Sequence, residues 1–110
     1  MNDINKVSRI LHLTLSKIPF VLMVSEAKNY EYRKPSKWIL SRLNGKDYDL
    51  IKFVNGCGSN MPYFIAKYKG YFIAENESNH SYPDLIVKIE KGDIVIRVGE
   101  IIESGNLNHS

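Results

Sequence analysis

Short blocks of hydrophobic residues, several of them alternating with polar ones, recur along the chain and predict a protein built mainly of strands. Residues 10–15 (ILHLTL) alternate in places and consist largely of residues that suit a strand, so we expect a strand there. The same reasoning predicts strands at residues 29–33, 49–54, 85–89 and 94–102. The pattern therefore places strands near both ends of the chain.

A first short helix is expected directly after residues 10–15. Pro19 suits the first turn of a helix, because proline has no backbone N–H to lose there. The apolar residues from that point share one helical face: Phe20, Met23, Val24 and Ala27. We therefore expect a helix over residues 19–27, although an extended reading of residues 20–24 competes with it.

A second short helix is expected to open at Pro35 and Ser36. Asn44 and Gly45 end it, since glycine tolerates the left-handed conformation that follows many helices. The residues expected to face inward are Trp38, Ile39 and Leu43. Those expected to face outward are Lys37, Ser41 and Arg42.

The near-duplicate segments YFIAKY and YFIAEN flank Lys69-Gly70, which predicts a β-hairpin that turns at this dipeptide. Residues 75–82 are polar and are expected to form a loop. The expected fold class is α+β: a small closed or half-closed β-barrel of about five to seven strands, with two short helices inserted in the N-terminal half. The expected domain spans residues 7–103, with flexible termini at residues 1–6 and 104–110.

Composition is that of an ordinary globular domain, with 110 residues of which 44% are hydrophobic and 25% charged. No apolar run approaches the ~18–20 residues that span a bilayer, and no signal-peptide pattern is present. We therefore expect a soluble, cytoplasmic protein without a membrane partner. The single cysteine, Cys57, excludes an internal disulfide, and no residues have metal-ligand spacing, so neither a metal nor a cofactor is expected.

Charge is unevenly distributed although the net charge is only +3. Residues 28–46 carry six basic side chains and one acidic one, whereas residues 75–103 carry seven acidic and three basic. A basic segment of this kind either binds phosphates or forms a solvated face. If it binds a nucleic-acid backbone, the expected phosphate contacts are Lys34, Lys37 and Arg42.

The basic segment begins with KNYEYR, in which Lys28, Glu31 and Arg33 form a candidate site. On a strand, Glu31 and Arg33 point to the same face, because side chains alternate with a period of two. A carboxylate held beside a guanidinium stays ionised and can accept hydrogen bonds from the amino edge of a base. A desolvated lysine beside another cation has a lowered pKa and can act as a base. The alternative is a structural Arg–Glu pair with an exposed lysine.

Aromatic residues are interleaved with these charges. Tyr30, Tyr32 and Trp38 are candidate stacking surfaces for a base, although Trp38 is expected to belong to the core. Two further segments are expected to complete the cleft, one after the first strand and one in the glycine-bearing loop at residues 55–60. The expected ligand-binding residues are Ser16, Lys17, Lys28, Glu31, Arg33, Asn55, Gly56 and Ser59.

With this order of elements, the chain resembles the ASCH family, whose members have a PUA-like β-barrel. That family carries a G-x-K-x-x-E-x-R signature after its first helix. Lys28, Glu31 and Arg33 match it, while Glu26 stands in place of the glycine. The likeness continues through the helix that bears Trp38, through DYDLIKFVNGCGS, and to DIVIRVGEII at the end, as in a phage and bacterial subgroup of small single-domain members.

The resemblance implies a nucleic-acid-associated domain that binds RNA or a modified nucleoside in a cleft beside its first helix. Some members hydrolyse the amide of an acetylated cytidine, and ribonuclease activity also occurs in the family. An enzyme in the same cleft would use Lys28 as base and Glu31 to orient substrate or water, although the hydrolysing members carry a hydroxyl residue at the place of Glu31. A third possibility is a phage-type interaction protein whose basic face docks on a host protein.

Overall fold

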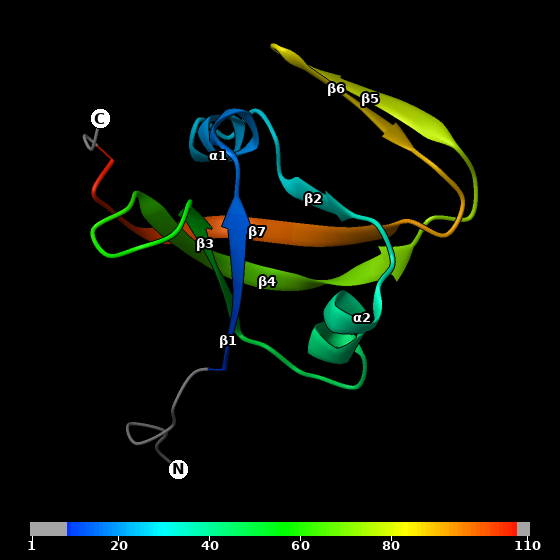
Figure 1. Cartoon of the computed structure of the whole chain (residues 1–110), viewed down its shortest axis with the longest axis horizontal. Coiled ribbons are helices and arrows are strands. Elements are labelled where there is room, and N and C mark those ends of the chain that lie inside the picture. The colour runs from blue at the N-terminus through cyan, green and yellow to red at the C-terminus, as the bar shows by residue number, and fades with distance from the viewer. Residues whose placement is uncertain (1–8, 108–110) are drawn as a thin grey trace.

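The computed structural model describes residues 9–107, which form seven strands and, between the first and the third strand, two short helices (Figure 1). The elements are β1 (Ile10–Leu15), α1 (Lys17–Val24), β2 (Tyr30–Arg33), α2 (Lys37–Leu43), β3 (Leu50–Asn55), β4 (Tyr63–Ile73), β5 (Ser78–Tyr82), β6 (Leu85–Ile89) and β7 (Ile94–Gly105). Neither helix in this part of the chain is long and apolar enough to cross a membrane.

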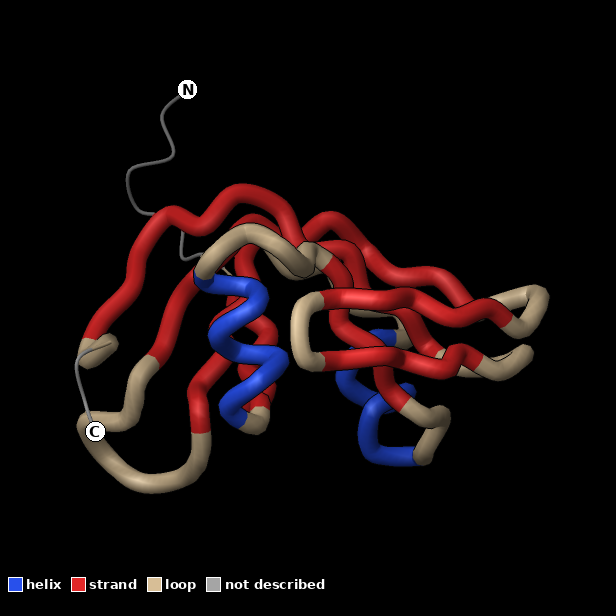
Figure 2. The backbone as a smooth tube through the Cα atoms, turned by 90° about the horizontal axis from the view of Figure 1, so that it is seen from above, coloured by secondary structure: helices blue, strands red, loops and turns tan. Residues whose placement is uncertain are grey.

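Five strands form one mixed sheet in the order β1-β3-β4-β7-β2, in which only the β1–β3 pair is parallel. The long strands β4 and β7 curl this sheet into a half-barrel, and Figure 2 shows the strands arching over α1. β5 and β6 pair with each other as a separate small sheet. The α+β class and the barrel-like curvature are confirmed, but β1 and β2 remain the two outer strands of an open sheet.

The core lies inside the curl of the sheet. Alternate residues of β1 and β3 point into it, so that Leu11 and Leu13 are buried and Phe53 is fully buried. α1 packs over the sheet through Phe20, whose ring centroid lies 5.4 Å from that of Phe64 on β4. Burying each such side chain contributes about 1.5–3 kcal/mol. This core fixes α1 against the end of β1, where the candidate site lies.

The predicted hairpin at Lys69-Gly70 is wrong, because residues 63–73 form the single strand β4. Gly70 has φ +89° and lies between Tyr68 and Tyr71, where the register with β7 shifts. Glycine thus supplies a bulge in place of a hairpin turn. The loop expected at residues 75–82 is also only partly present, since residues 78–82 form β5 against β6.

Trp38 does not belong to the core: half of its surface is exposed. In α2, Ile39 and Leu43 are the buried residues, and they lie one helical turn apart on the same face of the helix. Trp38 lies beside that face and not on it. The outward placement of Lys37, Ser41 and Arg42 agrees with the prediction. Ser36 caps α2 by accepting a hydrogen bond from the Ile39 N–H at 3.2 Å.

The ends of the predicted elements differ in small ways. The first helix spans residues 17–24 and not 19–27. β7 continues through Ser104 and Gly105, which pair with Phe64 and Tyr63, so these two residues are part of the sheet. The expected flexible termini otherwise fall largely on residues 1–8 and 108–110, which lie outside the described residues.

Candidate functional site

Lys28, Glu31 and Arg33 come together at the open side of the half-barrel. The Lys28 Nζ lies 3.3 Å from Oε1 of Glu31, and the Arg33 Nε donates to Oε2 of Glu31 at 2.7 Å. Arg33 also donates through Nη2 to the carbonyl oxygen of Thr14 at 2.6 Å. Because Thr14 is on β1 and Arg33 on β2, this side chain bridges the two outer strands of the sheet.

The loop between α1 and β2 places Lys28 inside the protein. The Lys28 N–H donates to the carbonyl oxygen of Leu22 at 3.2 Å, which holds the loop against the last turn of α1. Glu26 adopts a left-handed φ of +65°, a conformation that glycine takes at less cost. The backbone at Glu26 therefore has a geometry that suits glycine.

Burial makes this cluster unusual. Lys28 is 3% exposed and Glu31 6%. The loss of hydration lowers the pKa of Lys28, with the nearby Arg33 acting in the same direction, while Glu31 acts against them. Two cations surround one carboxylate, so the cluster carries a net positive charge when all three groups are ionised.

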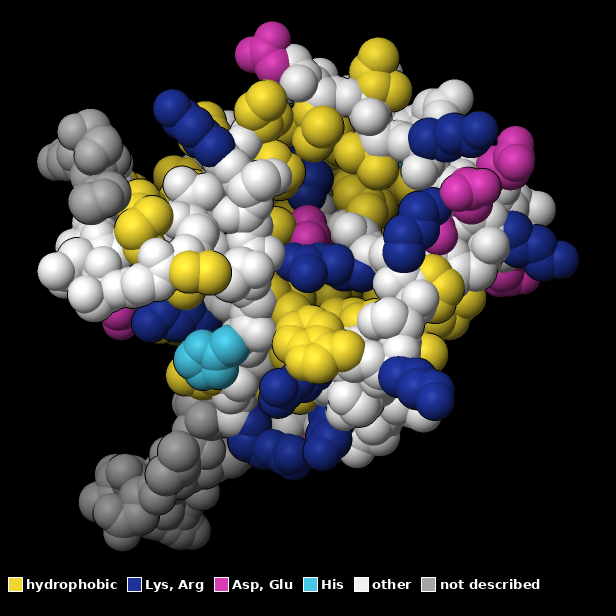
Figure 3. Space-filling view, viewed as in Figure 1, with side chains coloured by type: hydrophobic (Ala, Val, Ile, Leu, Met, Phe, Trp, Pro, Cys, Tyr) yellow, Lys and Arg dark blue, Asp and Glu magenta, His cyan; other side chains and the backbone are white. Residues whose placement is uncertain are grey.

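A cleft of about 330 Å³ opens onto the cluster. Its walls come from the end of β1, from α1, from β2 and from β6, and they are formed by Thr14, Leu15, Ser16, Pro19, Lys28, Glu31, Tyr32, Arg33, Leu85 and Val87. Figure 3 shows a hollow in the middle of this face, where basic and acidic side chains lie side by side among hydrophobic atoms. Polar groups at the base and apolar groups around them are typical of a ligand site.

Tyr32 lies between Glu31 and Arg33 on β2 and also lines this cleft. The Lys28 Nζ lies 5.2 Å from the centre of its ring. The hydroxyl of Tyr32 bonds with the hydroxyl of Tyr82 and, at 3.1 Å, with Nδ1 of His80. Burial and the hydrogen bond to Tyr82 raise the pKa of Tyr32. Tyr32 thus ties the β5–β6 hairpin to β2 and keeps its own ring in place.

The structure brings together only part of the predicted ligand-binding set. Ser16, Lys28, Glu31 and Arg33 line the cleft, whereas Lys17, Gly56 and Ser59 do not. Asn55 donates through Nδ2 to the carbonyl oxygen of Leu15 at 3.0 Å, which holds the end of β1. The lining residues that were not predicted are Thr14, Leu15, Pro19, Leu85 and Val87, and no local sequence signal identifies the last two, because β6 reaches the cleft only through the fold.

The three predicted phosphate contacts also differ from one another. Lys34 pairs with Glu90 at 2.8 Å and with Asp93 at 2.9 Å, and these bonds raise its pKa. Its charge is therefore already balanced. Lys37 and Arg42 are exposed on α2, and the Arg42 guanidinium lies 5.1 Å from the Trp38 ring.

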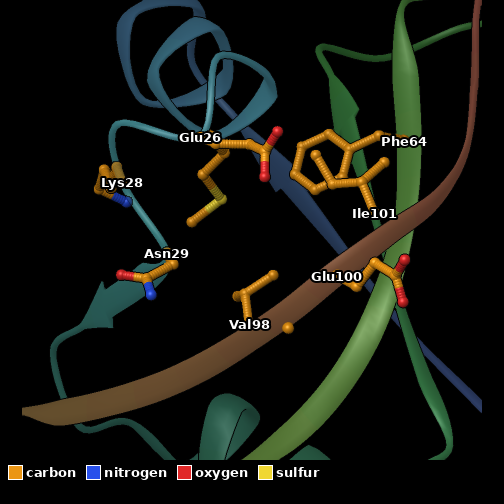
Figure 4. Close-up of a pocket in the computed structure, with 9 residues that line it drawn as sticks. Glu26, Lys28, Asn29, Phe64, Val98, Glu100 and Ile101 are labelled. Atoms are coloured by element: carbon orange, nitrogen blue, oxygen red, sulfur yellow. The ribbon is translucent and has the colours of Figure 1, made fainter.

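Lys28 also lines a second cavity, of about 310 Å³ (Figure 4). Lys28 and Asn29 border it on one side, and Phe64 and Ile101 lie across from them. Lys28 lines both cavities. Of the two cavities, Glu31 lines only the cleft of about 330 Å³. That cleft is therefore the better candidate for a ligand that contacts both Lys28 and Glu31.

Within residues 9–107, no group of three or more His, Cys, Asp or Glu side chains is placed to hold a metal ion. Comparisons with models of protein families, with curated proteins and with solved structures found no match to this chain. The chemistry of the cleft therefore has to be judged from its own residues.

Proposed function

We propose that the protein binds RNA or a modified nucleoside by holding one base in the cleft beside Lys28, Glu31 and Arg33, as its resemblance to the ASCH family implies. The observation that carries this proposal is the buried carboxylate of Glu31, which two cations hold from two sides in a cleft that Tyr32 also lines. A base that enters such a site leaves water and needs both stacking and a polar partner at its edge.

The hydrogen-bonding capacity of the cluster matches the edge of a base. A carboxylate has about four acceptor positions, and the two oxygens of Glu31 each accept one bond from the protein. Positions therefore remain for an exocyclic amino group, such as N4 of cytosine, for which carboxylates are common partners. Lys28 donates to Glu31 and to the carbonyl oxygen of Tyr30, which leaves one of its three N–H bonds to reach an acceptor next to that amino group.

Stacking against Tyr32 supplies the second part of the interaction. Tyr32 lines the cleft and its ring is held by the bonds of its hydroxyl, so it loses little freedom when a base binds. Such ring–base contacts contribute about 1–3 kcal/mol in single-strand sites. Leu85 and Val87 form an apolar wall from β6.

A second candidate function, hydrolysis of an acylated cytidine-type base, is favoured by the lowered pKa of Lys28. In this reaction the neutral amine of Lys28 takes a proton from water, and the resulting hydroxide attacks the acyl carbonyl carbon. The C–N bond then breaks, the proton passes to the departing N4 nitrogen, and a carboxylic acid and the free base are released. Glu31 would orient the water or the substrate.

Glu31→Gln separates the two candidates, because the change keeps the shape of the side chain and removes its charge. For a binder, loss of the charge-assisted bonds lowers nucleoside affinity roughly 5- to 100-fold. For a hydrolase, binding stays nearly intact while acetylcytidine turnover is abolished. Calorimetric titration with a panel of nucleosides and an assay of acetate release measure both, and the control is Asp47→Asn, an exposed carboxylate between α2 and β3. A change in stability alone, without any ligand for the wild type, contradicts both candidates.

A further inference from the structure

Trp38 is an exposed aromatic residue within a basic helix. It is 50% exposed, and Arg42 stacks its guanidinium over the ring at 5.1 Å. The two residues are four apart in α2, so they lie on the same helical face. α2 (KWILSRL) contains no acidic residue, and Lys37 adds a second exposed cation beside Trp38.

This helix lies close to the cleft. Only three residues separate Arg33, at the end of β2, from the start of α2. The Cα atoms of Arg33 and Trp38 are therefore at most about 18 Å apart. Figure 1 places α2 next to the end of β2, and Figure 3 shows exposed hydrophobic and basic side chains over α2 on the same face as the hollow.

We propose that Trp38 and Arg42 form a stacking platform for a second base, so that the ligand is a single-stranded RNA segment and not a free nucleoside. This inference rests on the proposed function, since the first base occupies the cleft. An indole face stacks with any base, and the Arg42 guanidinium that already lies over the Trp38 ring adds a cation–π contribution. Lys37 and Arg42 supply the charge that the connecting phosphates require.

Two observations favour a nucleic acid over a membrane or a protein partner. A helix that lies on a membrane exposes a whole apolar face, whereas Ile39 and Leu43 of α2 are buried in the core and the partly buried Leu40 packs against it. Trp38 is the only large hydrophobic residue of α2 that is exposed, too small a patch for a stable protein interface. A single aromatic ring among cations fits a strand of bases linked by phosphates.

The chain contains one tryptophan, so its fluorescence reports directly on this platform. We expect a short oligocytidylate to quench the fluorescence of the wild type, while cytidine alone binds without quenching it. Trp38→Ala should weaken binding of labelled oligocytidylate roughly 5- to 100-fold, measured by anisotropy, and leave the affinity for cytidine unchanged. Trp38→Phe should recover part of the loss. Ile86→Ala, at a residue 73% exposed on the β5–β6 hairpin, should have no effect.

Failure of this inference and failure of the proposed function give different results. If cytidine binds in a Glu31-dependent way but Trp38→Ala binds oligocytidylate as tightly as the wild type, the stacking platform is excluded. The proposed binding of one base in the cleft is then still supported. Quenching by vesicles of anionic phospholipid, with none by oligocytidylate, overturns the platform in favour of a membrane surface. If the wild type binds neither cytidine nor oligocytidylate, both proposals fail.

Discussion

The ammonium of Lys28 lies 3.3 Å from the carboxylate of Glu31, and both side chains are almost completely buried. Removing two charges from water is costly, and an apolar pair of similar volume often stabilises a protein as well or better. Arg33 and the carbonyl oxygen of Tyr30 offset part of this cost. Stability alone therefore does not account for keeping both charges in the protein, whereas the proposed ligand would use them.

Replacing Lys28 with methionine should destabilise the fold. Methionine fills a similar volume but cannot donate to Glu31 or to the carbonyl oxygen of Tyr30. We expect the free energy of unfolding in urea to fall by about 1–3 kcal/mol, because Arg33 still balances Glu31. Lys46→Met, at an exposed position, should change it by less than about 0.5 kcal/mol. Equal stability of Lys28→Met and the wild type would mean that the pair contributes nothing.

The same variant should change the pH dependence of stability. The pKa of Lys28 in the folded protein is below its ordinary value of 10.5, so between these two values the unfolded chain binds more protons than the folded one. Stability from this group therefore rises with pH up to about 10. The difference in unfolding free energy between the wild type and Lys28→Met should widen over that range, and a constant difference would argue against a lowered pKa.

Tyr68 should make the protein sensitive to strong alkali. Burial raises the pKa of Tyr68 from 10.0 to about 12, so the unfolded chain releases this proton first. The stability that Tyr68 contributes is complete below pH 10 and is lost as the pH rises toward 12. Tyr68→Phe should reduce this loss of unfolding free energy with rising pH, as measured by urea unfolding. Tyr63→Phe, which removes an exposed hydrogen bond to Glu103, should reduce it less. The same decline in Tyr68→Phe would contradict the assignment.

Tyr32 should control the mobility of the β5–β6 hairpin. Its hydroxyl is the polar link to Tyr82 and His80. Tyr32→Phe keeps the ring but breaks this link, so amide hydrogen exchange should accelerate in residues 78–89 and remain unchanged in β3 and β4. Unchanged exchange in the hairpin would show that apolar contacts hold it without the hydroxyl.

Lys37 and Arg42 should contribute to the salt dependence of RNA binding, whereas Lys34 should not. Each cation that contacts a phosphate of a single strand adds about 0.7 to the slope of log affinity against log salt. Lys37→Ala and Arg42→Ala should each reduce the slope by about this amount, for every sequence tested. Lys34→Ala is the matched control, because Glu90 and Asp93 already bind that ammonium. Equal effects of all three changes, in mobility shifts at several salt concentrations, would refute this distinction.

Local patterns predict much of this fold because they act through neighbouring residues. Alternation identified the strands at residues 10–15, 49–54 and 94–102, all of which form. The period of two also placed Glu31 and Arg33 on one face, where they bond. Lys28 joins them through the short loop after α1, which the spacing of the motif already indicated.

The predictions that were wrong depend on contacts between residues that are distant in the sequence. Gly70 supplies a positive φ to a hairpin turn or to a bulge equally well, and the length of β7 decides between them. Lys34 pairs with Glu90 and Asp93, which follow it by 56 and 59 positions in the sequence, and no local pattern shows such a pairing. Trp38 is exposed because Ile39 and Leu43 are the residues of α2 that pack into the core.

The most direct test of the central claim is a crystal structure of the protein with a short oligocytidylate. We expect one base in the cleft against Tyr32, with its amino group within hydrogen-bond distance of Glu31 and an acceptor near Lys28. A bound oligonucleotide that leaves this cleft empty, with its bases on another face of the protein, would contradict it.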